Sequence, residues 1–305
     1  MRLLHAPHLV LATASLLVLG ALVFTGVRAL PARQGGRTVS ASGGAAAPAQ
    51  TDVAHYAYKV VKSYPHDRRF FTQGLVYEDG FLYEGTGLYG QSAIYKRDLQ
   101  TGKTVKMLRL PEKYFGEGIT LFGDKLIQLT WRSHIGFIYG KDTFAPLGQF
   151  KYSMEGWGIT HDDKRLILSD GTSTLRFLDP NTYAETGRIE VRDQGRLVER
   201  INELEYVAPP PSGVIDSQPG AAGPQLYANI WQTDRIAIID PKTGLVTGWI
   251  DLAGLYTPPA DEREDSVLNG IAYLPQTKHL LVTGKCWPRM YEIELLPEPP
   301  GWPQQ

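Results

Sequence analysis

The stretch Phe115-Gly116-Glu117-Gly118-Ile119-Thr120 contains one copy of a pattern that decides the fold of this chain. A polar or aromatic residue comes first, usually followed by glycine, and then by aliphatic residues that suit a buried strand. The five copies are Gln73-Gly74-Leu75-Val76, Glu117-Gly118-Ile119-Thr120, Trp157-Gly158-Ile159-Thr160, Asn202-Glu203-Leu204-Glu205 and Asn269-Gly270-Ile271-Ala272. Their succession indicates an internal repeat that begins near Phe70.

Each copy is followed by two more segments of strand-like composition, separated by short turns. The second segments are Phe81 to Gly85, Lys125 to Thr130, Arg165 to Asp170, Gln225 to Ile230 and His279 to Gly284. The third segments are 93–95, 136–139, 175–178, 236–239 and 290–293. Repeats of about 40 to 45 residues with four strands each are typical of β-propeller blades.

The fourth strand of each repeat tests whether the repeats close into a ring. The first four repeats have one, at Val105 to Leu110, Leu147 to Tyr152, Gly187 to Val191 and Val246 to Leu252. The fifth repeat stops near Leu295, but Tyr58 to Pro65 has the composition of an outer strand. Pairing it with the last repeat would remove exposed sheet edges. We therefore predict an all-β fold, a five-bladed β-propeller with four-stranded blades over residues 53–298, whose last blade is closed by the N-terminal strand.

The N-terminal region differs in composition from the rest. A basic start and an apolar run of about 16 residues, Leu9 to Phe24, precede small residues near Ala32. We expect residues 1–32 to be a signal peptide or an uncleaved membrane anchor, and the Gly/Ala/Ser-rich residues 33–52 to be a flexible linker. The chain would then be exported to the periplasm, either soluble after cleavage or tethered to the inner membrane.

Composition excludes several classes of protein. The net charge of −1 argues against a nucleic-acid binder, which normally has a basic excess. Cys286 is the single cysteine, so no intramolecular disulfide can form, and a buried apolar role is expected for it. The seven histidines lack the spacing of a zinc-binding motif, so we expect neither metal nor cofactor.

A propeller brings the starts of its innermost strands together at one mouth of the central channel. The residues that open these strands are Gln73, Glu117, Trp157, Asn202 and Asn269, and those near the ends of the second strands are Glu84, Trp131, Asp170, Trp231 and Lys285. Together they would supply carboxylates, an ammonium group, amides and indoles to one pocket. The tryptophans could instead fill the core and the asparagines could be turn residues, while Glu84 and Asp170 suit salt bridges better than chemistry.

Several stretches in the same order resemble the plant and bacterial type of glutaminyl-peptide cyclotransferase, the glutaminyl cyclases. They are Phe70-Phe71-Thr72-Gln73-Gly74-Leu75, Tyr83-Glu84-Gly85-Thr86-Gly87, Phe115-Gly116-Glu117-Gly118-Ile119-Thr120, Leu129-Thr130-Trp131, Glu155-Gly156-Trp157-Gly158, Ile201-Asn202-Glu203-Leu204-Glu205, Ala228-Asn229-Ile230-Trp231, Leu268-Asn269-Gly270-Ile271-Ala272 and Gly284-Lys285-Cys286-Trp287-Pro288. The resemblance extends from about Tyr56 to Leu296, apart from a Pro/Gly/Ser-rich insertion at Pro209 to Pro224 that is expected to be a surface loop.

The resemblance implies a five-bladed propeller that converts N-terminal glutamine of peptides or proteins to pyroglutamate and releases ammonia without a metal. We expect the protein to be a monomer. It implies that Glu117 is the acid/base carboxylate and that Asn202 and Lys285 stabilise the oxyanion. Its substrate-binding positions are Phe71, Gln73, Phe115, Trp131, Trp157 and Trp231, to which the repeat pattern adds Asn269. Two alternatives are a metal-dependent, lactonase-like propeller and a propeller without enzymatic activity that binds a partner in the cell envelope.

Overall fold

The computed structural model describes residues 53–209, 223–259 and 266–298, and every helix-or-strand element in these ranges is a β-strand. The all-β prediction is therefore confirmed. The predicted leader at 1–32, the linker at 33–52 and nearly all of the insertion after Val207 lie outside the described residues. No described segment is a helix long and apolar enough to cross a bilayer.

Three antiparallel sheets follow one another, and each has four strands that pair in chain order. Their strands are β2 (Thr72–Glu78), β3 (Phe81–Thr86), β4 (Ala93–Asp98), β5 (Thr104–Arg109); β6 (Gly116–Phe122), β7 (Lys125–Thr130), β8 (Ile135–Gly140), β9 (Pro146–Lys151); and β10 (Ile159–His161), β11 (Leu166–Leu168), β12 (Thr174–Leu178), β13 (Glu185–Glu190). These are the first three predicted repeats. A short hairpin of β14 (Arg192–Asp193) and β15 (Arg196–Leu197) follows them, which the sequence did not predict.

The remaining strands form one sheet of eight, in the order β16-β17-β18-β19-β1-β22-β21-β20. Their bounds are β16 (Ile201–Val207), β17 (Gln225–Ile230), β18 (Arg235–Ile239), β19 (Val246–Asp251), β1 (Ala54–Pro65), β20 (Leu268–Leu274), β21 (His279–Gly284) and β22 (Arg289–Pro297). As predicted, the N-terminal strand β1 pairs with the last strand, β22, in antiparallel orientation. Its first residues also pair in parallel with β19, which joins the two halves of this sheet and was not predicted.

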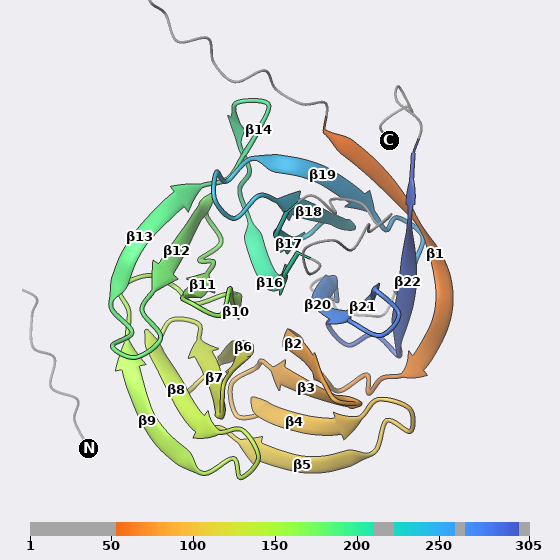
Figure 1. The fold of residues 1–305 in the computed structure, drawn as a ribbon. Coiled ribbons are helices and arrows are strands. Elements are labelled where there is room, and N and C mark those ends of the chain that lie inside the picture. Colours follow the sequence, from red (N-terminus) through yellow and green to blue (C-terminus); the bar gives the residue numbers. More distant parts are fainter. Residues whose placement is uncertain (1–52, 210–222, 260–265, 299–305) are drawn as a thin grey trace, which may run out of the picture. The chain divides into compact units, whose positions relative to one another are not determined.

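The sheets are arranged around a common centre (Figure 1). The strands β2, β6, β10, β16 and β20 lie nearest to that centre, and each contacts the next one around it. The strands β5, β9, β13, β19 and β1 lie at the periphery. Residues at the starts of the inner strands, far apart in the sequence, are thereby brought together.

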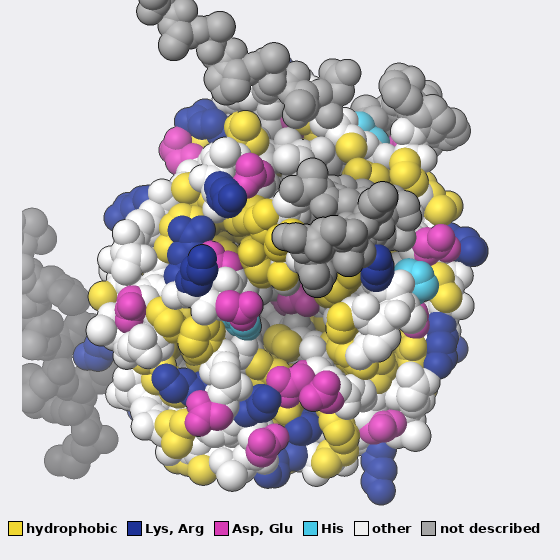
Figure 2. All heavy atoms as spheres, viewed as in Figure 1, with side chains coloured by type: hydrophobic (Ala, Val, Ile, Leu, Met, Phe, Trp, Pro, Cys, Tyr) yellow, Lys and Arg dark blue, Asp and Glu magenta, His cyan; other side chains and the backbone are white. Residues whose placement is uncertain are grey.

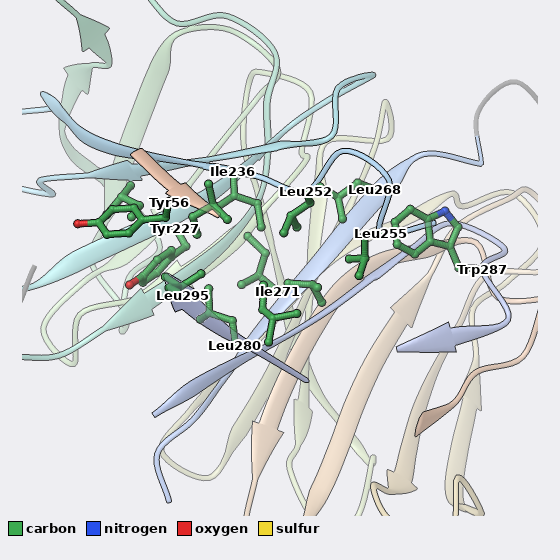
Figure 3. Close-up of a cluster of buried hydrophobic side chains, with 14 residues drawn as sticks. Tyr56, Tyr227, Ile236, Leu252, Leu255, Leu268, Ile271, Leu280, Trp287 and Leu295 are labelled. Atoms are coloured by element: carbon green, nitrogen blue, oxygen red, sulfur yellow. The ribbon is translucent and has the colours of Figure 1, made fainter. Parts of the chain in front are cut away.

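Apolar side chains between neighbouring sheets form the core of the described residues. One cluster lies between the two halves of the eight-stranded sheet, where Tyr227 and Ile236 from one half meet Leu280 and Ile293 from the other. Figure 3 shows this cluster, with Trp287 at one end. Burial of apolar area at about 25 cal/mol per Å² makes such clusters the main force that holds the sheets together.

Glycines at the second position of the repeated pattern allow the inner strands to approach closely. A Cβ atom on Gly118 would lie 2.6 Å from the carbonyl oxygen of Trp157, and one on Gly158 would lie 2.1 Å from that of Asn202. The fourth copy has Glu203 at this position instead. Its carboxylate accepts hydrogen bonds from the backbone N–H groups of Leu75 (3.2 Å) on β2 and Ile271 (2.8 Å) on β20.

The surface seen in Figure 2 carries lysine and arginine side chains interspersed with aspartate and glutamate. Ion pairs among the described residues include Arg165 with Asp162 and Lys141 with Glu78. This distribution agrees with a net charge close to zero.

Candidate active site

One pocket of about 240 Å³ gathers nine of the ten predicted site residues. They are Phe71, Gln73, Phe115, Glu117, Trp131, Trp157, Asn202, Trp231 and Lys285, and Leu88 completes the lining. The volume is below the range of about 300–1,000 Å³ that is usual for drug-sized ligands. The pocket therefore suits a small group, such as one terminal residue of a peptide.

The lining comes from two kinds of position that recur in the repeats. Gln73, Glu117 and Asn202 lie at the beginnings of the inner strands β2, β6 and β16. Trp131, Trp231 and Lys285 each follow the last residue of a second strand, after β7, β17 and β21. Because the inner strands meet at the centre of the ring, residues from four different sheets reach one pocket.

Glu117 is the buried carboxylate of the pocket, with 5% of its surface exposed. The side-chain amide of Gln73 donates a hydrogen bond to its Oε1 atom over 3.0 Å. Burial raises the pKa of Glu117 well above its usual value, the positive charge of Lys285 opposes this rise, and the negative charge of Glu155 adds to it. A carboxyl group with such a pKa can exchange a proton closer to neutral pH.

Asn269 is the predicted site residue that does not line the pocket. Its side-chain N–H group donates to the backbone oxygen of Thr72 (2.9 Å) and to Oε1 of Gln73 (3.3 Å). Since the Gln73 oxygen accepts from Asn269, its nitrogen is turned toward Glu117. Asn269 thus orients Gln73, which lines the pocket, and does not line the pocket itself.

Lys285 is also buried, with 5% exposed, and its Nζ atom lies 4.7 Å from the centre of the Phe71 ring. This is a cation–π distance. The backbone N–H of Lys285 donates to the oxygen of Val267, and that of Cys286 donates to the oxygen of Phe70. The second of these bonds joins the residue after Lys285 to the residue before Phe71. Cys286 is only partly buried, in contrast to the expected core position.

Aromatic rings form two groups in the walls. Phe115 lies between Phe71 (ring centroids 6.2 Å apart) and Trp131 (5.5 Å), while Trp157 packs edge-on against Trp231 at 5.5 Å. The position of Phe115 requires a glycine nearby, because a Cβ atom on Gly87 would lie 2.4 Å from its ring.

Glu84 and Asp170, named as weaker candidates, do not reach the pocket and form ion pairs instead. Glu84 is wholly buried and accepts hydrogen bonds from Thr72 and Arg97. Its Oε1 also lies 2.7 Å from Nε2 of His66, whose Nδ1 lies 2.5 Å from the backbone oxygen of Trp287. Both ring nitrogens of His66 thus lie within hydrogen-bond distance of an oxygen atom.

Four residues around the pocket were not predicted from the sequence. Leu88, with a left-handed φ of 81°, lines it, and the next residue, Tyr89, packs edge-on against Phe115 while 53% of its surface stays exposed. Glu155 and Arg132 lie behind the tryptophan walls. Glu155 was quoted only as part of a motif, and no local pattern distinguishes any of the four from ordinary loop residues.

The arrangement offers acid/base and electrostatic chemistry. A desolvated carboxyl group, an ammonium group and an amide surround a small space with aromatic walls. Among the described residues no group of three or more His, Cys, Asp or Glu side chains is placed to hold a metal ion.

Comparisons with known proteins agree on one family. The family model described as glutamine cyclotransferase matches residues 37–295. A glutaminyl-peptide cyclotransferase of Arabidopsis thaliana is 42% identical over 241 residues, which cover 78% of this chain and 71% of that protein. The crystal structure of a glutaminyl cyclase from Myxococcus xanthus matches with a TM-score of 0.69 and 33% identity, over 81% of this chain and all of the other. The chain therefore belongs to the glutamine cyclotransferase family.

Proposed function

We propose that this protein is a glutaminyl-peptide cyclotransferase, an acyltransferase that converts the N-terminal glutamine of peptides or proteins to pyroglutamate and releases ammonia. The relatives named above carry this activity in their names. The observation that supports it most directly is the placement of Glu117, Lys285 and Asn202 in one small pocket with aromatic walls.

The reaction joins two atoms of the same residue. The neutral α-amine attacks the carbon of the γ-carboxamide, a C–N bond forms to close a five-membered lactam, and the bond to the amide nitrogen breaks so that ammonia leaves. The substrate must fold back on itself, and an enzyme that holds this conformer removes an entropic barrier worth several kcal/mol. The rings of Trp131, Trp157 and Trp231 are suited to confine such a flat, folded side chain.

Glu117 carries the proton in the proposed mechanism. It accepts a proton from the attacking amine and delivers it to the departing nitrogen, so no net proton is consumed by the protein. General acid–base catalysis works best when the pKa of the group lies near the working pH. The raised pKa of Glu117 supports this role, and its hydrogen bond from Gln73 fixes the orientation of the carboxylate.

Lys285 and Asn202 would stabilise the negative charge that develops on the carboxamide oxygen. Both side chains are buried, with 5% and 2% of their surfaces exposed, so few water molecules compete with them. Loss of one such donor typically costs about 2.7–4 kcal/mol of transition-state stabilisation. Gln73, Phe71 and Phe115 complete the binding site, and Asn269 acts by orienting Gln73.

For the fold we propose five blades, with the eight-stranded sheet counted as two. One blade would be β16 to β19, and the other β20 to β22 closed by β1. The apolar cluster between these two halves supports the division, because the other clusters also lie between neighbouring sheets (Figure 3). The link between the halves is a parallel pairing of only Ala54, His55 and Tyr56 with β19.

The remaining proposals rest on the sequence. Residues 1–32 would direct export to the periplasm, as a cleaved signal peptide or as a membrane anchor, with 33–52 as linker and 53–298 as the catalytic domain. The protein would act as a monomer on peptide or protein N-termini that begin with glutamine.

Ammonia release from a glutamine-initiated dipeptide, measured with and without a chelator, tests the function. We expect release in both conditions and none from the same dipeptide with a blocked α-amine. Release that stops with chelator would favour the metal-dependent alternative, and no release from any glutamine-initiated peptide would favour the non-enzymatic one.

A further inference from the structure

Glu155 occupies a central place behind the pocket walls. It lies between β9 and β10, and one third of its side chain (33%) is exposed. Its Oε2 atom accepts hydrogen bonds from the indole N–H groups of both Trp131 (2.6 Å) and Trp157 (3.1 Å). Its Oε1 atom accepts from Nε of Arg132 over 2.9 Å. One carboxylate therefore serves three donors.

The two indoles come from different sheets. Trp131 follows β7, whereas Trp157 precedes β10 of the next sheet. A single oxygen atom that accepts from both fixes the distance between them across the boundary between the sheets. Arg132 contacts both partners of one of these bonds. Its guanidinium lies 3.8 Å from the centre of the Trp131 ring, and its Nε donates a hydrogen bond to Glu155.

Glu155 also acts on Glu117 through its charge. Burial works to raise the pKa of Glu155, but hydrogen bonds from Arg132 and the two indoles outweigh it and lower that pKa. Glu155 thus stays ionised while Glu117 titrates. The other ionisable groups coupled to Glu117 are Lys285, which lowers its pKa, and Tyr152, whose own pKa is raised to about 12 so that it remains neutral.

We propose that Glu155 is a positioning residue of the reaction: it holds the Trp131 and Trp157 walls at a fixed spacing through one carboxylate oxygen and keeps a negative charge near Glu117. The inference rests on the proposed function, since both effects act on the cyclisation of glutamine. The wall spacing would determine how well the folded-back substrate is held, and the charge would add to the rise in the pKa of Glu117 that burial causes.

Three substitutions separate these two effects. Glu155→Gln removes the charge but keeps an oxygen that can accept from an indole. Glu155→Asp keeps the charge but shortens the side chain, and Glu155→Ala removes both. Glu190→Gln is the matched control, because Glu190 is an exposed carboxylate that also pairs with an arginine, Arg192, and does not line the pocket.

The measurement is the pH profile of kcat and KM for a glutamine-initiated dipeptide, on variants whose folding is checked by their unfolding temperatures. We expect the acidic limb of kcat/KM to move to lower pH in Glu155→Gln and to stay near the wild-type position in Glu155→Asp. We expect Glu155→Ala to lose about tenfold or more in kcat/KM, as for a lost hydrogen bond to a charged group. Glu190→Gln should behave like the wild type.

Unchanged pH limbs and unchanged kcat/KM in both Glu155→Gln and Glu155→Asp would overturn the inference, whether or not Glu155→Ala folds. In that case the wild type still releases ammonia, so the proposed function stands. A wild type without any ammonia release would overturn the proposed function, and the inference with it.

Discussion

Glu84 and Glu117 are two buried carboxylates in neighbouring sheets, yet their surroundings differ sharply. Glu84 has no exposed surface and receives hydrogen bonds from Thr72 and Arg97 and a contact with His66. Glu117 is nearly as buried, but Gln73 is the donor identified for it among the described residues. Burial works to raise both pKa values; the charges of His66 and Arg97 hold that of Glu84 below its usual value, whereas that of Glu117 rises.

The comparison shows that the donors around a buried carboxylate, more than its depth, decide its role. With Arg97 and His66 beside it, Glu84 has a lowered pKa and ties together the segments carrying His66, Thr72 and Arg97. With one amide donor and a lysine nearby, Glu117 can gain and lose a proton. The first environment stabilises the fold, and the second suits catalysis.

The largest expected effect is on activity, from Glu117→Gln. Removing the acid/base group should lower kcat by about 10²- to 10⁴-fold. The unfolding free energy should not fall, because a neutral amide replaces a poorly solvated carboxyl group of similar shape. Ammonia release and urea denaturation of the same preparation check both statements. A turnover close to that of the wild type would remove Glu117 from the mechanism.

The same change at the other site, Glu84→Gln, should act on stability instead. It leaves Arg97 without its counter-charge, and breaking a buried ion pair from one side typically costs about 3–5 kcal/mol. Urea denaturation would measure this loss. Because the pKa of Glu84 is lowered by folding, its contribution is present above the unfolded pKa and disappears as pH falls through the folded one. Equal stability of the variant and the wild type at pH 7 would contradict the prediction.

Glu205 is a third carboxylate, and the donor identified for it among the described residues is the backbone N–H of Tyr273. Burial raises its pKa from 4.5 to about 8, an effect that this bond reduces but does not cancel. Between these two values the folded state holds a proton that the unfolded state has released, so stability should fall as pH rises. The slope for one proton is at most about 1.4 kcal/mol per pH unit.

Glu205→Gln should therefore flatten the decline of unfolding free energy between pH 4.5 and pH 8. Denaturation curves at several pH values within this window would reveal it. Glu203, whose pKa burial and Glu205 also raise, would retain its own share of the slope. Parallel stability profiles for variant and wild type would mean that Glu205 is ionised in the folded protein.

Much of the fold could be predicted because each copy of the repeat indicates where its strands begin and end. The second strands at Lys125–Thr130 and Gln225–Ile230 have the bounds that the pattern gave. The pairing of β1 with β22 could be predicted because the fifth repeat lacks a fourth strand and the N-terminal strand belongs to no other repeat. Two features could not be predicted in this way: the parallel pairing of β1 with β19 and the hairpin of β14 and β15. Neither is part of the repeat, so the repeated pattern carries no information about them.

The lining of the pocket could be predicted for the same reason, since equivalent positions of a repeat converge at the centre of a ring. What could not be predicted is which neighbour each side chain meets. Glu155 accepts from an indole 24 residues before it in the sequence, and Asn269 bonds Gln73 without lining the pocket itself. The protonation behaviour of Glu84 and Glu117 likewise depends on contacts that only the folded chain creates.

Glu203 gives the ring a property that open repeat arrays lack. In a solenoid the terminal repeats contact one neighbour each and can fray independently. Here a single side chain from β16 bonds the backbones of β2 and β20, the first and the last of the inner strands. Moving either β2 or β20 away would remove one of the two backbone hydrogen bonds to the buried Glu203 side chain. Local opening between β2 and β20 is thereby coupled to the hydrogen bonds that β16 makes with both strands.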